Sequence, residues 1–153
     1  MSEWFNTWEG KLSIWIKTVE VEDLNKLRRN TLNELMGIRI TEIGEDYLKA
    51  VMPVDDRTRQ PMGILHGGAS MVLAESIGSF GSYLAIAPDK RCVGLDINAN
   101  HIRSIADGWV TGTARPIHIG GSTHVWDIRI TDEKERLICL ARLTMAIMNQ
   151  PTH

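Results

Sequence analysis

The sequence has few cysteines and no long apolar run, and each absence excludes a class of protein. Its two cysteines, Cys92 and Cys139, lack a Cys-x-x-Cys or Cys/His metal spacing, so we expect reduced core thiols and no disulfide. No stretch approaches the roughly 20 apolar residues that span a bilayer. The start, MSEWFNTWEGKLSIWIK, lacks the continuous apolar segment of a signal peptide. These absences predict a cytoplasmic protein without a membrane partner.

Charge is also unremarkable in amount and distribution. The chain carries 17 Lys and Arg against 19 Asp and Glu, and the two signs are intermixed. There is no basic stripe of the kind that binds nucleic acid, so we expect no nucleic-acid partner. At 153 residues, without repeats or linkers, the chain is long enough for one domain and short for two.

Apolar spacing in the first half predicts two helices around a hairpin. Leucines 24, 27, 32 and 35 recur at helical spacing, which predicts a helix over residues 21–35, and Gly37 is the expected stop signal after it. The segment IRITEIGEDYLKAVMPV reads as a hairpin that turns around residues 44–46. The long apolar run from His66 to Ala87 predicts a helix that is buried on most sides.

The second half consists of four extended runs that begin RCVGL, GWVTG, STHVW and RLICL. They alternate with period two, so that Val93, Leu95, Ile97 and Ala99 are expected to share a face, as are Trp126, Ile128 and Ile130. The order of elements predicts an α+β fold in which an antiparallel meander is wrapped against the long helix.

One acidic residue, Glu75, interrupts the apolar run MVLAESIGSF. A buried carboxylate is costly without a partner, a raised pKa or a wet cavity, so its presence suggests a site. Ser79 lies one helical turn later on the same face. At the helix start, His66 precedes Gly67 and Gly68, where free backbone N–H groups can bind a carbonyl oxygen as an oxyanion hole.

A purely structural interpretation stays open at this point. Glu75 could pair with Arg103 or Arg142, and His66 could simply cap its helix. Other motifs offer less, because the sequence contains no GxSxG nucleophile elbow, no GxGxxG fingerprint and no HExxH. The five histidines lack compact metal-ligand spacing, so we expect no metal site. Trp4, Trp8 and Trp15 are most simply packing or interface residues.

The segments RQPMGILHGGASMVLAESIGS, VGLDINANHIRS and VWDIRI together resemble hotdog-fold thioesterases of the 4-hydroxybenzoyl-CoA thioesterase, PaaI-like group. The resemblance extends in particular to the branch with 1,4-dihydroxy-2-naphthoyl-CoA thioesterase and its proofreading relative. It divides the chain into an N-terminal extension, 1–14, and a hotdog domain, 15–150. It implies a curved antiparallel sheet around a long helix, and a homodimer or homotetramer with active sites between two chains.

The resemblance also assigns roles to residues. Glu75 becomes the nucleophile or general base, and Ser79 positions the carboxylate or a water molecule. Gln60, His66 and Gly67, contributed from across the interface, orient or polarise the thioester. Other residues are implied in substrate binding: for the acyl group Met62, Phe80, Tyr83 and His101, and for the nucleotide part of coenzyme A Arg103, Ser122 and Thr123.

The implied activity is hydrolysis of an acyl-CoA, with an aromatic acyl group such as dihydroxynaphthoyl or hydroxybenzoyl, and without a cofactor. Glu75 could attack the thioester directly or deprotonate a water molecule. Three alternatives stay open: a proofreading thioesterase that acts on an acyl or aryl carrier protein, a hotdog dehydratase, and a non-catalytic acyl-CoA-binding module. The position of Glu75 nine residues after His66 fits the thioesterases better than the dehydratases.

Overall fold

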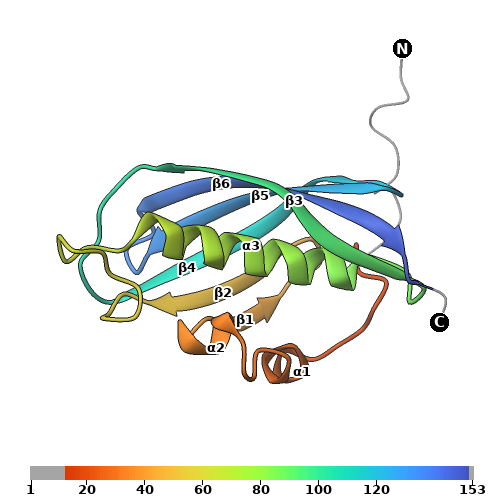
Figure 1. Cartoon of the computed structure of the whole chain (residues 1–153), viewed down its shortest axis with the longest axis horizontal. Helices are drawn as coiled ribbons and strands as arrows, with labels where there is room; N and C mark the ends of the chain where they lie inside the picture. The colour runs from red at the N-terminus through yellow and green to blue at the C-terminus, as the bar shows by residue number, and fades with distance from the viewer. Residues whose placement is uncertain (1–12, 152–153) are drawn as a thin grey trace, which may run out of the picture.

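A computed structural model describes residues 13–151 of the chain as one sheet with a long helix against it (Figure 1). Most of the expected extension, with Trp4 and Trp8, lies outside these residues. The three helices are α1 (Val21–Lys26), α2 (Leu32–Leu35) and α3 (Gly67–Leu84). The six strands are β1 (Arg39–Ile43), β2 (Leu48–Pro53), β3 (Lys90–His101), β4 (Trp109–Ile119), β5 (Thr123–Asp132) and β6 (Leu137–Asn149).

The six strands form one antiparallel sheet in the order β1-β2-β4-β5-β6-β3. The α+β class, the hairpin and the four later strands are therefore confirmed. The expected simple meander is wrong, because β3 pairs with β6, and β4 pairs with β2. The alternation of apolar residues predicts which face of the sheet a side chain occupies, but it does not predict which strand pairs with which.

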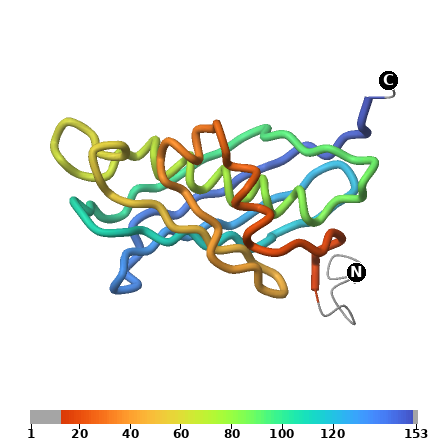
Figure 2. Tube along the Cα trace, turned by 90° about the horizontal axis from the view of Figure 1, so that it is seen from below, coloured from red at the N-terminus to blue at the C-terminus, as the bar shows by residue number. Residues whose placement is uncertain are grey.

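The first predicted helix is two short helices. Helix α1 ends at Lys26, and Asn30 has a φ of 58°, which no α-helix allows. The chain then resumes as α2, and Leu27, Leu32 and Leu35 are exposed instead of facing one core. Figure 2 shows this first part of the chain crossing beside α3.

Strand β3 departs from strict alternation. A bulge between Gly94 and Asp96 places an extra residue in the strand. As a result Cys92 and Ile97, five residues apart, both pack against the core, while Val93 and Leu95 are exposed. The expected shared face of Val93, Leu95, Ile97 and Ala99 is therefore wrong. The expected face of Trp126, Ile128 and Ile130 is confirmed, since all three are fully buried.

The core lies between α3 and the sheet, with Trp126 at its centre. Gly78 and Gly81 let the helix approach closely, because a Cβ at Gly81 would lie 2.7 Å from the Trp126 ring. Trp126 Nε1 donates to Ser82 Oγ at 2.8 Å, and its ring stacks on Trp15 at a centroid distance of 6.3 Å. Trp15 thus packs as expected and ties the segment before α1 to the domain.

Both cysteines are free, and burial raises the pKa of each thiol. Within residues 13–151, no helix has both the length and the apolar character needed to cross a membrane.

Candidate functional site

Helix α3 begins at a cap made by His66. The His66 ring accepts a hydrogen bond from the Gly68 N–H at its Nδ1 atom, at 2.8 Å, and the backbone N–H of His66 donates to the Thr58 carbonyl at 2.8 Å. The capping role that the sequence left open is therefore confirmed. The Gly67 N–H, at the first position of the helix, has no acceptor within residues 13–151. It is available to a ligand oxygen at the positive end of the helix dipole.

A pocket of about 300 Å³ adjoins this helix start. Its lining includes Gln60, Gly67, His101 and Arg103, so four predicted site residues share one pocket. His101 approaches Gly67 closely, since a Cβ at Gly67 would lie 2.6 Å from His101 Nε2 and the imidazole would have to shift. The Gln60 side chain is held by a hydrogen bond that its Oε1 accepts from the Met62 N–H.

Glu75 lies elsewhere, eight residues along the same helix. It lines a second, open pocket of about 390 Å³ together with Ser79 and residues of the α2 region. The expected burial is wrong for the single chain, because only one side of α3 faces the sheet and Glu75 lies on the exposed side. A rise of about 1.5 Å per residue separates Gly67 and Glu75 by about 12 Å along the helix.

The carboxylate of Glu75 has no cationic neighbour in the described part of the chain. Neither Arg103 nor Arg142 pairs with it, and no ion pair within residues 13–151 includes it. Strand β3 passes close to the carboxylate, since a Cβ at Gly94 would lie 2.8 Å from Glu75 Oε1. The glycine therefore leaves the space that the carboxylate occupies, and the oxygens stay free for chemistry.

Of the residues expected around the acyl group, only His101 lines one of these two pockets, the one at the helix start. Met62 is 79% exposed on the loop that carries Gln60. Phe80 is half-buried against the core, and Tyr83 is exposed beneath the Lys17 ammonium, which lies 4.0 Å from its ring centroid. Ser79 Oγ contacts Met145 Sδ at 3.7 Å and makes no hydrogen bond to Glu75. One chain therefore does not assemble these residues around a single carbonyl.

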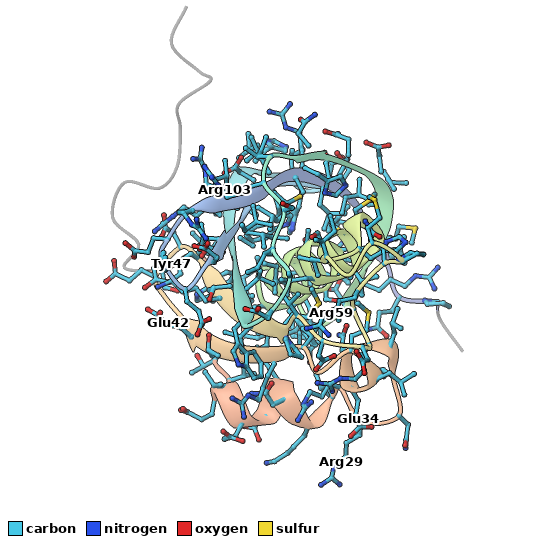
Figure 3. All side chains as sticks on the ribbon, turned by 90° about the vertical axis from the view of Figure 1, so that its left-hand side faces the viewer. Arg29, Glu34, Glu42, Tyr47, Arg59 and Arg103 are labelled. Atoms are coloured by element: carbon cyan, nitrogen blue, oxygen red, sulfur yellow. The ribbon has the colours of Figure 1, made fainter. Side chains whose placement is uncertain are left out.

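The residues expected to hold the nucleotide part of coenzyme A lie at opposite ends of the sheet. His101, two residues before Arg103, pairs with Cys139, whereas Thr123, next to Ser122, pairs with Ala146. These partners are seven positions apart on β6, which corresponds to about 23 Å at roughly 3.3 Å per residue. Figure 3 views the molecule from the Arg103 end, with Arg103 at the upper left and Glu34 of α2 at the lower right. A single chain cannot bring the three together.

Two residues of the Glu75 pocket were missed by sequence reasoning. Ser76 Oγ donates a hydrogen bond to Asn33 Oδ1 at 2.6 Å, which joins α3 to α2. Both side chains line the pocket. Ser76 stands directly beside Glu75 in the sequence, but nothing in the local pattern indicated that Asn33, 43 residues earlier, would meet it.

Comparison with known proteins identifies the class of this fold and site. The model of the family described as the thioesterase superfamily matches residues 62–139. The chain is 50% identical to the 1,4-dihydroxy-2-naphthoyl-CoA hydrolase of Escherichia coli, over 88% of this chain and 99% of the relative. It is 44% identical to the proofreading thioesterase EntH of Cronobacter turicensis, over 88% and 98%.

Solved structures give the same result. A mutant thioesterase from Pseudomonas aeruginosa superposes with a TM-score of 0.89 at 49% identity, over 90% of this chain and 100% of that one. A thioesterase from Haemophilus influenzae gives 0.89 at 47% identity, over 92% and 98%. The chain belongs to the thioesterase superfamily, as the sequence resemblance predicted. It is a thioester hydrolase with the hotdog fold.

Proposed function

We propose that the protein hydrolyses an aromatic acyl-CoA thioester at a site that two chains build together, with Glu75 as the nucleophile or general base. The observation that carries this proposal is the separation of two half-sites on one helix. The helix start with Gln60, His66 and Gly67 can polarise a carbonyl, and Glu75 can supply an oxygen nucleophile. About 12 Å lies between them along α3, so one chain cannot apply both to the same carbonyl.

Pairing of two β3 strands would join the half-sites. In each chain, Gly67 lies beside His101, and Glu75 lies beside Gly94. If two β3 strands pair antiparallel about an axis near residues 97–98, His101 of one chain falls opposite Gly94 of the other. The Gly67 end of one helix then approaches Glu75 of the second chain. The free edge of β3 supports this homodimer, and further association into a homotetramer is compatible with it.

The chemistry of the joined site follows from its groups. The Gly67 N–H and the positive end of α3 would stabilise the developing oxyanion, and Gln60 would orient the thioester. Glu75 would attack the carbonyl to give an anhydride and release the thiolate of coenzyme A, and water would then open the anhydride. In the general-base route, Glu75 would take a proton from a water molecule that attacks directly. Ser79, one turn away, would hold that water.

The remaining expected residues complete the proposal. Phe80, Tyr83, Met62 and His101 would surround the acyl group once two chains combine, and Arg103 of one chain would approach the Ser122–Thr123 turn of the other near the nucleotide. The free thiols support a reducing, cytoplasmic location. The packing of Trp15 supports a hotdog domain over 15–150 that follows an N-terminal extension, 1–14.

A second candidate is proofreading hydrolysis of a thioester on an acyl or aryl carrier protein, and the naming of the Cronobacter relative as a proofreading thioesterase supports it. Both candidates use the same half-sites and differ only in what holds the thiol. Assays with one acyl group on coenzyme A and on an acyl or aryl carrier protein would separate them. Preference for the carrier by kcat/KM would favour the second candidate.

The test of the proposed function is the change Glu75→Gln, which keeps the shape of the side chain and removes the nucleophile. We expect kcat for benzoyl-CoA and hydroxybenzoyl-CoA hydrolysis to fall by about 10³-fold or more, a barrier increase of about 4 kcal/mol. The melting temperature should hold, because Glu75 has no ion pair to lose in the described part of the chain.

Gln60→Ala serves as the comparison, since Gln60 would orient the substrate without reacting. It should lower kcat/KM less than Glu75→Gln does. Near-normal kcat in Glu75→Gln would refute the catalytic role. A sharp fall in melting temperature would indicate instead that Glu75 stabilises the fold.

A further inference from the structure

The Glu75 pocket has a polar wall that the proposed mechanism does not use. Ser76 Oγ donates to Asn33 Oδ1 at 2.6 Å, and both side chains are half-buried. Ser76 follows Glu75 on α3, while Asn33 comes from the four-residue helix α2. The contact therefore places the Asn33 amide beside the serine that follows the proposed nucleophile, and all three side chains line one pocket.

The backbone of α2 holds Asn33 in place without help from its side chain. The Asn33 carbonyl accepts a hydrogen bond from the Ile38 N–H at 2.9 Å, and the Met36 N–H donates to Leu32 O at 3.0 Å. Met36 is buried and anchors the end of this short helix, and Gly37 follows in the left-handed conformation with a φ of 69°. The position of Asn33 therefore does not depend on its side chain alone, whose amide oxygen accepts from Ser76.

The pair is complementary to a hydroxyl group. With the Ser76 proton donated to Asn33, the amide keeps its N–H donors and the serine oxygen keeps an acceptor lone pair. A hydroxyl on a ligand can accept from the amide and donate to the serine at the same time. The opposite amide orientation also leaves one donor and one acceptor, so the match to a hydroxyl does not depend on it.

The other lining residues limit the kind of ligand that fits. Leu32 and Val72 are apolar, Thr31 and Ser79 carry hydroxyls, and Glu75 is the only charged residue among the seven that line the pocket. An anionic acyl group would be repelled by Glu75 with no cation in this wall to offset it. A volume of about 390 Å³ lies within the range of small-molecule sites.

We propose that Asn33 and Ser76 determine acyl specificity by binding a hydroxyl substituent of the acyl group. This inference rests on the proposed function, because it takes Glu75 to mark where the thioester carbonyl lies. The two residues bind the acyl group and take no part in bond breaking. They select a neutral, hydroxylated acyl thioester over its counterpart without the hydroxyl.

The test compares benzoyl-CoA with the three monohydroxybenzoyl-CoAs in the wild type and in two variants. Asn33→Leu keeps the approximate size of the side chain without its hydrogen bonds, and Ser76→Ala removes the hydroxyl alone. We expect the wild type to prefer at least one hydroxylated ring by about tenfold in kcat/KM, and each variant to remove most of that preference. Hydrolysis of benzoyl-CoA should fall by a smaller factor than hydrolysis of the preferred hydroxylated ring.

The double variant provides a further readout. If the two residues bind one hydroxyl together, Asn33→Leu with Ser76→Ala should lose no more selectivity than either single variant. Leu35→Ala is the matched control, since Leu35 lies on the same helix, is 70% exposed and does not line the pocket. It should leave selectivity unchanged.

The outcomes separate this inference from the proposed function. Unchanged selectivity in both variants, or an equal fall for all four thioesters, would overturn the inference and leave thioester hydrolysis intact. A wild type that hydrolyses benzoyl-CoA with no preference for a hydroxylated ring would also overturn it. Failure of the wild type to hydrolyse any acyl-CoA would refute the proposed function itself.

Discussion

The two edges of the sheet are finished in different ways. Strand β1 is five residues long, and the Asn25 side chain of α1 bonds both the N–H and the carbonyl of Ile40, each at 2.9 Å. Strand β3, at the other edge, is twelve residues long, has β6 as its one partner among residues 13–151, and exposes Val93 and Leu95. One edge is closed by the chain itself, and the other presents a long row of backbone groups.

This difference suggests a division of labour within one sheet. Short strands, covering segments and bulges are devices that protect an edge from pairing with another chain. The β1 edge is short and covered, and it also has a register irregularity between Ile40 and Glu42, whereas β3 has a bulge but combines length with exposed apolar side chains. The half-sites of α3 lie along the unprotected edge, next to Gly94 and His101. Stability and assembly should therefore respond separately to changes at the two edges.

The largest expected effect comes from Leu95→Lys at the open edge. Leu95 is 61% exposed, so the change should leave the fold of the chain intact. Lysine is a side chain that natural sheets use to prevent edge pairing. We expect a shift from dimer to monomer by sedimentation velocity at micromolar concentration. The value of kcat/KM should fall by more than about 10²-fold, as removal of oxyanion donors from a site does.

Ile117→Lys is the control for this change. Ile117 is 53% exposed on β4, an inner strand, so the same charge there should alter neither assembly nor activity. A Leu95→Lys protein that stays dimeric and fully active would refute assembly through β3. So would a fully active wild-type monomer.

The elements that were predicted correctly are those whose signals are local. The turn residues around Gly44 and the long, mostly apolar run of α3 are each continuous in the sequence. The break at Asn30 was missed because the spacing of leucines carries no information about the positive φ angle of that residue. The pairing of β3 with β6 was missed because it joins residues about 50 apart, and the sequence pattern of β3 fits either neighbour.

The same limit applies to the site. His66, Gly67 and Glu75 lie within one segment, so a motif could identify them together. Their division between two pockets depends on which side of α3 faces the sheet, and that follows only from packing against β3 and Trp126. Asn33 reaches Ser76 through the fold alone, and no local pattern could have indicated the pair.

Between the two edges, the central strand β5 carries a buried histidine that should make stability depend on pH. Burial, with repulsion from His118 as a smaller cause, lowers the pKa of His124 from 6.5 to about 4. Ser82 accepts from Trp126 and can donate its own proton to His124 Nδ1, at 3.0 Å, which favours the neutral ring. The unfolded chain therefore binds more protons between pH 6.5 and 4.

The stabilisation from neutral His124 should be complete above pH 6.5 and lost as the pH falls toward 4. We expect the loss of this contribution to lower the free energy of unfolding by about 3 kcal/mol between pH 7.5 and pH 4. Urea unfolding of the wild type and of His124→Gln over this range measures the contribution, because the carboxylates titrate in both proteins. Parallel pH profiles for the two proteins would contradict the prediction.

The smallest expected effect is at the closed edge, in Asn25→Leu. The change keeps the approximate size of the side chain and removes both hydrogen bonds to Ile40. Because each bond contributes about 0.5 to 1.5 kcal/mol, the free energy of unfolding should fall by about 1 to 2 kcal/mol. Lys26→Ala, one residue along α1, breaks only the exposed ion pair to Asp23 and should lower the free energy of unfolding less than Asn25→Leu does. Because Asn25 lies at the edge away from β3, the dimer and kcat should persist at temperatures where the variant is folded. Loss of the dimer in Asn25→Leu without loss of stability would show that the two edges are coupled, and the division between a stabilising edge and an assembling edge would then be wrong.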